Sequence, residues 1–345
     1  MGATQLRCSC TRSQDWVSLA GIMRAMTYRH YGPPDVLECV EVATPEPADD
    51  EVLVKVRAAS VNPLDWHFMR GSPFVVRIVT GIFGPRDGRL GVDLAGVVDA
   101  VGARVTGFRP GDEVFGASRG AVAEFVSARE DRLVAKPDNI TFEEAAAVPI
   151  AGITALQGLR DKGRIRAGQK VLVIGAAGGV GTFAVQIAKS YGAQVSGVCS
   201  TRNMEMVASI GADHVVDYTR DDFSRSGEQY DIILDCIGNR TLSECRRAMS
   251  ERGIHVAVGG DDRLLSMLIG FAWARLLSMF ASQSFVSFLA VIRGKDLALL
   301  AGLMEDGKVA PTIDRRYPLE HSADAIRYLE TMHARGKVVI SIDAP

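Results

Sequence analysis

Hydrophobic and polar positions divide the chain into two parts with different periods. Residues 51–61 read EVLVKVRAASV, where valines at alternate positions are separated by leucine, lysine and arginine. This alternation is typical of a half-buried strand. Residues 91–102, 110–116 and 121–128 continue as short β-type segments broken by glycine and proline. The first part of the chain is therefore expected to be mostly β-structure and to form a small barrel.

The pattern changes near residue 141, where Thr141 and Glu144 form a capping box that predicts the start of a helix. From residue 170 onward, strand-type and helix-type segments alternate. The expected strands read KVLVIG, QVSGVCS, HVVDY, DIILDCIG and HVAVGG, and the expected helices cover residues 179–191, 203–210 and 241–249. Such alternation predicts a parallel, doubly wound sheet. In the tail, 308–345, SADAIRYLETMHARGK is expected to be helical and VVISI to be a strand.

The composition is that of a globular protein with about two domains, because 47% of the 345 residues are hydrophobic. The 39 basic and 41 acidic residues nearly balance, so nothing suggests a nucleic-acid partner. The six cysteines are scattered without a CxxC pair. This usage favours a reducing, cytoplasmic setting over a disulfide framework.

Two segments need separate interpretation. Residues 1–22 lack the continuous apolar core of a signal peptide, and we expect a loose extension ahead of Met23.

Residues 264–292 are strongly apolar, but Arg275 interrupts them and no uncharged run reaches the ~20 residues of a spanning helix. We therefore expect no integral membrane span. A buried helix that packs on the body or on a second subunit is the favoured interpretation, with membrane-surface contact as the alternative.

The stretch VLVIGAAGGVGTFAVQIAK, residues 171–189, reads as a strand, a glycine turn and a helix. The turn has the form A-x-G-x-x-G, with Ala176 in place of the first glycine of the dinucleotide-binding fingerprint. Gly178 would let the backbone approach a pyrophosphate, and Gly181 would let the helix pack closely on the sheet. The expected apolar face of the helix consists of Val180, Ala184, Ile187, Ala188 and Tyr191. The expected cofactor contacts of the turn are Ala177, Gly178, Gly179, Val180 and Gly181.

The residues after this turn predict which dinucleotide is bound. NAD is usually recognised by an acidic residue about 20 positions past the fingerprint, but residues 182–204 contain no acid. Ser200, Thr201 and Arg202 stand at the end of the second strand instead, and a hydroxyl and a guanidinium can bind a 2′-phosphate. We expect NADPH as the cofactor; a solvated Arg202 is the alternative.

The segment GQKVLVIGAAGGVGTFAVQIAK resembles the signature of the quinone oxidoreductase/zeta-crystallin family, a zinc-independent branch of the medium-chain dehydrogenases/reductases. YGPPDVLE, VNPLD, PGDEVFG, GADHVVDY and HARGK are similar to other segments of that family, and the similarity covers nearly all of residues 23–345. The resemblance implies a GroES-like β-barrel catalytic domain over 23–147, to which 293–345 returns. It also implies a Rossmann domain over 148–292, leaving 1–22 outside, and a homodimer formed through an edge strand of the Rossmann sheet.

The same resemblance implies further cofactor contacts. Tyr218 should lie beside the adenosine phosphate with Ser200 and Arg202, and Thr154 should approach the nicotinamide. Arg335 and Lys337 of HARGK should close over the cofactor from the tail. The plain alternatives are a Tyr218 that caps a strand, a Thr154 with a hydroxyl satisfied inside its helix, and solvated Arg335 and Lys337.

Three residues at expected strand ends complete the expected cofactor contacts. Cys236 lies near the expected crevice, where a buried, inert thiol is the favoured interpretation. Gly238 and Gly259 end neighbouring strands and would leave room for the nicotinamide ribose.

The positions that bind catalytic zinc in zinc-dependent members of the superfamily correspond here to Asn62, Val92 and Ile150. An amide and two aliphatic side chains cannot hold Zn²⁺, and no four-cysteine structural loop is present. We expect no metal. A trio of Asn62, Asp65 and His67 is a weak alternative.

Without a Lewis acid to polarise a carbonyl group, substrates that accept hydride readily are favoured. Quinones and α,β-unsaturated carbonyl compounds are such substrates, because conjugation spreads the negative charge that develops on them. The sequence therefore predicts an NADPH-dependent, zinc-free reductase of quinones or α,β-unsaturated carbonyl compounds. An NADP-dependent alcohol dehydrogenase or aldehyde reductase and a non-catalytic NADPH-binding protein are the alternatives. The substrate pocket is expected near residues 62–76, 77–90 and 264–290.

Two residues are the candidates for catalysis. The Asn62 amide would hydrogen-bond a carbonyl oxygen or a ribose hydroxyl; a loop amide bonded to its own backbone is the alternative. His67 is a candidate proton donor, although it stands where many zinc-free relatives carry a tyrosine, and a structural histidine is the alternative. Asp65 is expected to brace this loop through backbone hydrogen bonds.

Overall fold

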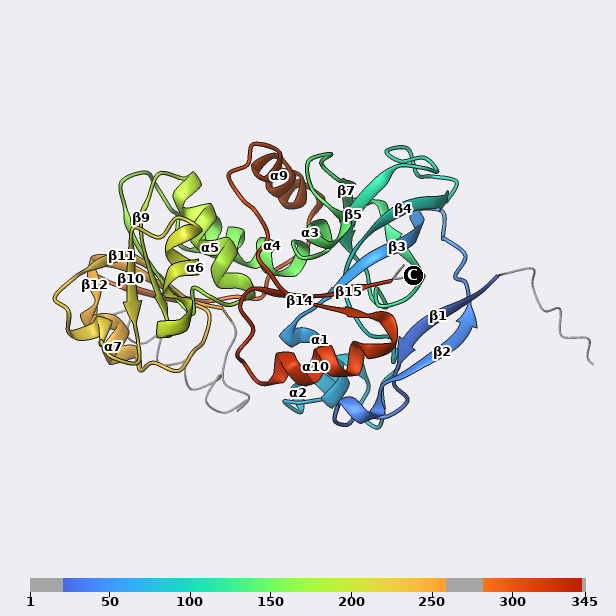
Figure 1. The fold of residues 1–345 in the computed structure, drawn as a ribbon, viewed down its shortest axis with the longest axis horizontal. Helices are drawn as coiled ribbons and strands as arrows, with labels where there is room; N and C mark the ends of the chain where they lie inside the picture. Colours follow the sequence, from blue (N-terminus) through green and yellow to red (C-terminus); the bar gives the residue numbers. More distant parts are fainter. Residues whose placement is uncertain (1–20, 259–281, 343–345) are drawn as a thin grey trace, which may run out of the picture.

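A computed structural model describes residues 21–258 and 282–342 of the chain. Figure 1 shows two lobes, one built around strands β1–β7 and the other around strands β8–β12, with helices α3 and α4 between them. After the second lobe the chain returns to the first, where β15 pairs with β3 and β14 pairs with β15. The expected combination of a GroES-like domain and a Rossmann-type parallel sheet is confirmed.

The Rossmann-type sheet has six parallel strands within the described residues, in the order β10-β9-β8-β11-β12-β13. The strands are β8 (Lys170–Ile174), β9 (Gln194–Cys199), β10 (His214–Asp217), β11 (Tyr230–Asp235), β12 (Met249–Ala257) and β13 (Ser284–Ser287). The inner strands β8, β9 and β11 are almost wholly buried, as parallel strands covered by helices require. The strand order reverses between β8 and β11, and this switch point is where such sheets bind ligands.

The described α-helices of this lobe include α4 (Pro149–Gln157), α5 (Gly179–Ser190), α6 (Met204–Ser209) and α7 (Leu242–Arg247). Helix α5 was expected to bury one apolar face, but residues 181–188 are all buried. The reason is that α5 is covered on several sides. On one of them the Gln186 side chain donates to the carbonyl of Ala310 over 2.9 Å and accepts from its N–H over 2.8 Å.

The strands of the first lobe form two sheets among the described residues. The pair β1 (Ile22–Thr27) and β2 (Glu38–Ala43) stands alone, and the larger sheet runs β14-β15-β3-β4-β5-β7, with β6 paired to β3. Its strands are β3 (Glu51–Val61), β4 (Asp93–Val101), β5 (Glu113–Ala117), β6 (Phe125–Arg129), β7 (Leu133–Ala135), β14 (Ile313–Pro318) and β15 (Lys337–Ser341). Register shifts near Val54 and Val56 let the long strand β3 bend and pair with several partners.

Helices α1 (Pro63–Arg70), α2 (Val75–Thr80), α3 (Phe142–Ala146), α9 (Gly294–Glu305) and α10 (Ser322–Glu330) complete the described helices of four or more residues, apart from a π-helical turn after α4. The capping box expected at residues 141–144 is confirmed: the Thr141 N–H donates to the Glu144 carboxylate over 2.8 Å, and the Glu144 N–H donates to the Thr141 hydroxyl over 3.2 Å. It starts α3, which links the two lobes.

Three expected boundaries differ from the structure. The helix expected over SADAIRYLETMHARGK ends at Glu330, because Met332 adopts a left-handed conformation with φ of 58°. The helix expected to reach residue 249 ends at Arg247, and β12 begins at Met249. The loose extension was expected to reach residue 22, but Ile22 is already the first residue of strand β1 and pairs with Ala43.

The apolar segment 264–292 is described only in part. Residues 259–281 lie outside the described residues, and the expected buried helix falls mostly there. The described remainder of the segment contains β13, an edge strand of the parallel sheet. Among the described helices, none combines the length and the apolar composition that a membrane crossing needs.

Candidate functional site

The glycine turn lies between β8 and α5, at the switch point of the parallel sheet. A Cβ on Gly181 would come within 2.1 Å of the Gly175 carbonyl oxygen, so only glycine lets α5 pack this closely. A Cβ on Gly178 would meet only the Gly175 oxygen, at 3.4 Å, and therefore faces open space. Since the first N–H groups of a helix have no partner inside it, the start of α5 fits a pyrophosphate.

The C-terminal tail runs beside this turn. Gly336 forms an isolated parallel bridge with Gly178, and a Cβ on Gly179 would lie 3.2 Å from the Cδ atom of Lys337. The HARGK segment is therefore next to the turn, where the family resemblance places it.

Arg335 ties the tail to the end of β9. Its Nε donates to the side-chain oxygen of Asn203 over 2.7 Å and its Nη2 to the carbonyl of Arg202 over 2.6 Å. Arg202 in turn reaches the carbonyl of His333 over 3.3 Å. These contacts place two guanidinium groups at the strand end where a 2′-phosphate is expected, and Arg335 is not simply solvated.

An acidic residue lies close to the same strand end and was missed in the sequence. Asp217, at the end of β10, is buried and accepts hydrogen bonds from the hydroxyls of Thr201 and Thr219. The Thr201 hydrogen bond, followed by those of Thr219, lowers the pKa of Asp217. The segment 182–204 contains no acid, but the neighbouring strand supplies one. The ring of Tyr218, the next residue, is half exposed.

Asn62 belongs to a buried polar network around Asp93, the first residue of β4. The Asn62 amide donates to Asp93 Oδ2 over 2.8 Å, and the Lys337 ammonium donates to the Asn62 amide oxygen. Lys337 Nζ lies 3.4 Å from Asp93 Oδ2. Ser60 also donates to Oδ2 over 2.9 Å, and the Ile150 N–H donates to Oδ1 over 3.0 Å.

Lys337 is therefore not solvated, since its side chain is only 3% exposed. Burial lowers the pKa of its ammonium, and the nearby Asp93 and Asp65 oppose that effect. Asp93 was not singled out in the sequence. An acid within the apolar run GVDLAGVV is the signal that could have identified it, because such a charge is buried only with partners.

Asp65 braces the loop as expected. Its Oδ2 accepts the backbone N–H of Asn62 over 2.7 Å, which completes a capping box at the start of α1. Burial raises the pKa of Asp65 to about 7; the Asn62 N–H and the charges of Lys337 and Arg119 act against this, and Asp93 adds to it. The carboxyl group can therefore hold a proton near neutral pH.

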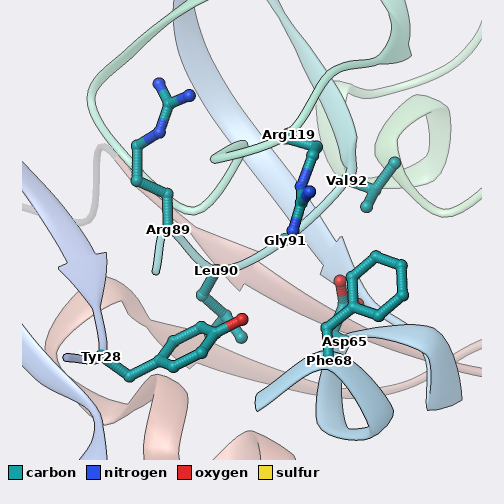
Figure 2. Close-up of a pocket in the computed structure, with 8 residues that line it drawn as sticks. All are labelled: Tyr28, Asp65, Phe68, Arg89, Leu90, Gly91, Val92 and Arg119. Carbon is teal, nitrogen blue, oxygen red and sulfur yellow. The ribbon is translucent and has the colours of Figure 1, made fainter. Parts of the chain in front are cut away.

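A pocket opens beside this loop. It is lined by Tyr28, Asp65, Phe68, Arg89, Leu90, Gly91, Val92 and Arg119, which Figure 2 shows as sticks. The stretches expected to supply the substrate pocket, 62–76 and 77–90, both contribute to it, and the third stretch, 264–290, lies mostly outside the described residues. Tyr28 and Arg119 were missed because they lie far from these stretches in the sequence.

His67 does not line this pocket. Its Nδ1 lies 2.7 Å from the carbonyl oxygen of Ser72, and its ring packs on Trp66 with centroids 3.7 Å apart. Its role as a proton donor stays a prediction.

Thr154 donates a hydrogen bond from its hydroxyl to the Ile150 carbonyl over 2.6 Å within α4. This agrees with the alternative that the hydroxyl is satisfied inside its own helix.

The residues expected at strand ends are described in part. Burial raises the pKa of the Cys236 thiol. Gly238 has a φ of 75°, and its N–H donates to Asp235 over 2.8 Å. Gly259 lies outside the described residues.

The three positions that correspond to zinc ligands gather around Asp93. Asn62 and Ile150 both hydrogen-bond its carboxylate, and Val92 precedes it in the chain. Neither a thiolate nor an imidazole stands at these positions, and the cation beside the carboxylate is the Lys337 ammonium. These side chains do not fit a catalytic zinc ion.

A separate trio has metal-type side chains. Asp235, Cys245 and His255, from β11, α7 and β12, form the one such group within residues 21–258 and 282–342, with ligand atoms within 4.8 Å of one another. His255 Nε2 lies 3.6 Å from an Asp235 oxygen. The trio is distinct from the three positions around Asp93.

Two family models match the chain. One, described as "Alcohol dehydrogenase GroES-like domain", matches residues 48–138, and the other, described as "Zinc-binding dehydrogenase", matches residues 210–340.

Among curated proteins, the chain is 33% identical over 337 residues to the "Quinone-oxidoreductase homolog, chloroplastic" of Spinacia oleracea, covering 93% of this chain and 99% of that protein. It is 34% identical to the "NADPH-dependent alkenal/one oxidoreductase, chloroplastic" of Arabidopsis thaliana, covering 92% and 79%. Among solved structures, the quinone oxidoreductase from Coxiella burnetii superposes with a TM-score of 0.83 at 30% identity, covering 93% of this chain and all of that one.

Proposed function

The chain belongs to the quinone oxidoreductase-like family of the medium-chain dehydrogenases/reductases and is an NAD(P)H-dependent oxidoreductase of the quinone or enone type; on this premise we propose that it is a zinc-free, NADPH-dependent reductase. The observation that carries the proposal is the network at Asp93. Where a catalytic zinc ion would need thiolate or imidazole ligands, the chain supplies Asn62 and the ammonium of Lys337. The substrates proposed are quinones and α,β-unsaturated carbonyl compounds.

The preference for NADPH rests on charge at the end of β9. Arg202 and Arg335 lie together there, and guanidinium groups suit a 2′-phosphate. The Asp217 carboxylate at the same strand end already accepts hydrogen bonds from the hydroxyls of Thr201 and Thr219. It therefore does not need the two ribose hydroxyls of NADH as hydrogen-bond donors. The Arabidopsis relative carries NADPH in its name.

When bound, the nicotinamide would supply the hydride. The glycine turn and the start of α5 would bind its pyrophosphate, and Arg335 and the tail would hold the adenosine end. One N–H and the oxygen of the Asn62 amide hold Asp93 and Lys337, so its second N–H is the group that would donate to a ribose hydroxyl or carbonyl oxygen. Asp65, whose pKa is raised by burial to about 7, is a protein group of this loop that would carry a proton for the reaction. His67 stays a second candidate proton donor.

Conjugated acceptors fit such a site better than plain ketones or aldehydes. In a conjugated acceptor the negative charge that follows hydride addition spreads onto an enolate or hydroquinone oxygen, so hydrogen bonds can stabilise it without a metal. An alcohol dehydrogenase or aldehyde reductase activity, and NADPH binding without catalysis, are the alternatives that the experiment must separate.

The test is the initial rate of NADPH oxidation, compared with NADH, after exhaustive dialysis against EDTA. The acceptors are 1,4-naphthoquinone, a linear enone and its saturated aldehyde counterpart. Reduction of the first two with a preference for NADPH is expected. Turnover of the aldehyde alone, lost on chelation, would contradict the proposal, and tight NADPH binding without any turnover would favour the non-catalytic alternative.

Two further expectations remain proposals. Strand β13 pairs with β12 on one side and ends the sheet among the described residues; its other edge is the proposed edge for a homodimer, and sedimentation velocity would test the association. The cytoplasmic setting is likewise a prediction, and cell fractionation would test it, since the two curated relatives named above have "chloroplastic" in their names.

A further inference from the structure

The pocket in Figure 2 contains two arginines whose surroundings differ. Arg89 is held by Asp87, with two hydrogen bonds of 2.9 Å to its carboxylate oxygens. Figure 2 shows the Arg89 guanidinium directed away from Asp65 and Tyr28, whereas Arg119 extends toward them. Only Arg119 therefore brings its charge to the inside of the pocket.

The Arg119 guanidinium has no hydrogen bond or salt bridge with the part of the chain that the structure describes. It lies over the ring of Phe68, whose centroid is 5.1 Å from Cζ. Arg119 is half-buried, so water reaches only part of it. A guanidinium has five N–H donors and no acceptor, and these donors are free for a ligand in the pocket.

The loop that carries Arg119 is fixed on both sides by backbone hydrogen bonds. The Ser118 N–H donates to the Val92 carbonyl over 2.9 Å, and the Gly120 N–H donates to the Gly91 carbonyl over 2.9 Å. Both acceptors belong to residues that line the same pocket. The backbone of Arg119 is thus held in place before any ligand binds, which lowers the entropy cost of positioning the residue.

The charge of the pocket is only partly balanced by acids. Asp65 is its one acidic lining residue, and that carboxyl group already accepts the Asn62 N–H. Burial raises its pKa to about 7, so near neutral pH it is only partly ionised. Because Arg89 is paired with Asp87 and Asp65 is only partly ionised, the charge of Arg119 is only partly balanced by the acid that lines the pocket.

We propose that Arg119 binds a carboxylate group of the substrate, so that the preferred substrates are conjugated enones or quinones that carry an acidic group. This inference rests on the proposed function. Val92 and Asp65 connect the pocket directly to Asp93 and Asn62, so a substrate anchored at Arg119 extends toward the polar network. In the reaction NADPH would supply the hydride and become NADP⁺, and a proton would come from water or a protein group. With an enone the hydride and the proton add across the carbon–carbon double bond, with a quinone they give the hydroquinone, and the carboxylate is unchanged in both.

The experiment compares trans-3-benzoylacrylate with its methyl ester, which keeps the conjugated ketone and removes the charge. The variants are R119M, R119K and the control R109M, which removes an exposed arginine of the same lobe. R119M should lower kcat/KM for the acid at least about tenfold and change the ester less than about twofold, since a hydrogen-bonded charge is lost. R119K should recover part of the loss, and R109M should change neither substrate. Each variant is compared with wild type on the same substrate, so the different intrinsic reactivities of acid and ester cancel.

Equal effects of R119M on acid and ester would overturn the inference while leaving the reductase activity established. If neither probe nor 1,4-naphthoquinone is reduced, the proposed function itself fails. The anchoring role is then decided by calorimetric titration with 3-benzoylpropionate, the saturated acid, in the presence of NADP⁺. Binding to wild type and R119K but not to R119M would support the role, and absence of binding to wild type would overturn it.

Discussion

Lys337 and Asp93 form a buried ion pair, with 3.4 Å between Nζ and Oδ2 and side chains that are 3% and 0% exposed. The pair joins β15, near the end of the chain, to the first residue of β4. Asn62 bridges the two charges with its amide. The C-terminal tail, the Asn62 loop and the core of the first lobe are thereby held in one arrangement.

Removing one partner of this pair should be costly. K337M leaves Asp93 buried without its cation, and we expect a loss of about 3–5 kcal/mol in the stability of the first lobe. The double variant D93N/K337M should lose less, because no uncompensated charge remains. Chemical denaturation followed by tryptophan fluorescence measures both. K308M is the control, since Lys308 and Asp306 form an exposed pair, and a K337M protein as stable as K308M would contradict the ion-pair interpretation.

Two glycines of the turn should separate cofactor binding from stability. G178A adds a Cβ that meets the Gly175 oxygen only at an ordinary 3.4 Å, so the fold should persist while the methyl group blocks the pyrophosphate. G181A should destabilise the protein, because its Cβ would come within 2.1 Å of the same oxygen. Thermal unfolding and NADPH titration by fluorescence measure the two effects.

Gly302 of α9 has nothing within 4 Å of a Cβ position, so G302A is a control that should leave NADPH affinity unchanged and raise stability by about 0.5–1 kcal/mol, since alanine is the better helix former. The explanation of the turn fails if G178A binds NADPH as wild type does.

Arg202 should contribute to the choice of dinucleotide. R202A removes a guanidinium from the end of β9, and we expect the Kd for NADPH to rise about tenfold with little change for NADH, because only NADPH carries the 2′-phosphate. R225A is the matched control, since Arg225 is exposed and its nearest acid is Asp222. Equal weakening of both dinucleotides by R202A would assign the residue a role other than phosphate recognition.

Asp65 should make stability depend on pH in a defined direction. Burial raises its pKa from 3.8 to about 7, so the unfolded chain ionises at lower pH than the folded one. The associated stability is present at low pH and is lost as the pH rises from about 4 through about 7, by at most about 4 kcal/mol. D65N keeps an oxygen for the Asn62 N–H but does not ionise.

Wild type should therefore lose stability relative to D65N between pH 4 and pH 8, as measured by the difference between their unfolding midpoints. A constant difference across this range would show that the Asp65 carboxyl group is not perturbed. D222N serves as a control at a carboxylate whose pKa is instead lowered, by a hydrogen bond from Ser224.

The sequence predicts best what depends on neighbouring residues. The strand, turn and helix around residues 171–189 follow from an apolar run, a glycine spacing and a helical period, and the structure places them as expected. The capping box at Thr141 is local in the same sense. The end of α10 was predicted too late because Met332 takes a left-handed conformation. Methionine has no preference for that conformation, so the sequence does not indicate it.

The candidate site was harder to predict because its contacts join distant parts of the chain. Lys337 was expected over the cofactor, but its charge is paired with Asp93, 244 positions away. Asp217 escaped a search limited to the segment after the turn, since the adjacent strand brings it there. Arg119 carries no motif at all, and only the folded loop directs it into the pocket.

The most direct test of zinc-free enone reduction is the fate of the cofactor's hydride. EDTA-dialysed protein is given an enone with NADPH deuterated at C4 of the nicotinamide, each C4 epimer in turn, and the product is examined by NMR. We predict that one epimer delivers deuterium to the β-carbon of the saturated product at the rate of the metal-replete protein. Deuterium at a carbinol carbon instead, or turnover that returns only when zinc is added, would contradict a zinc-free enone reductase.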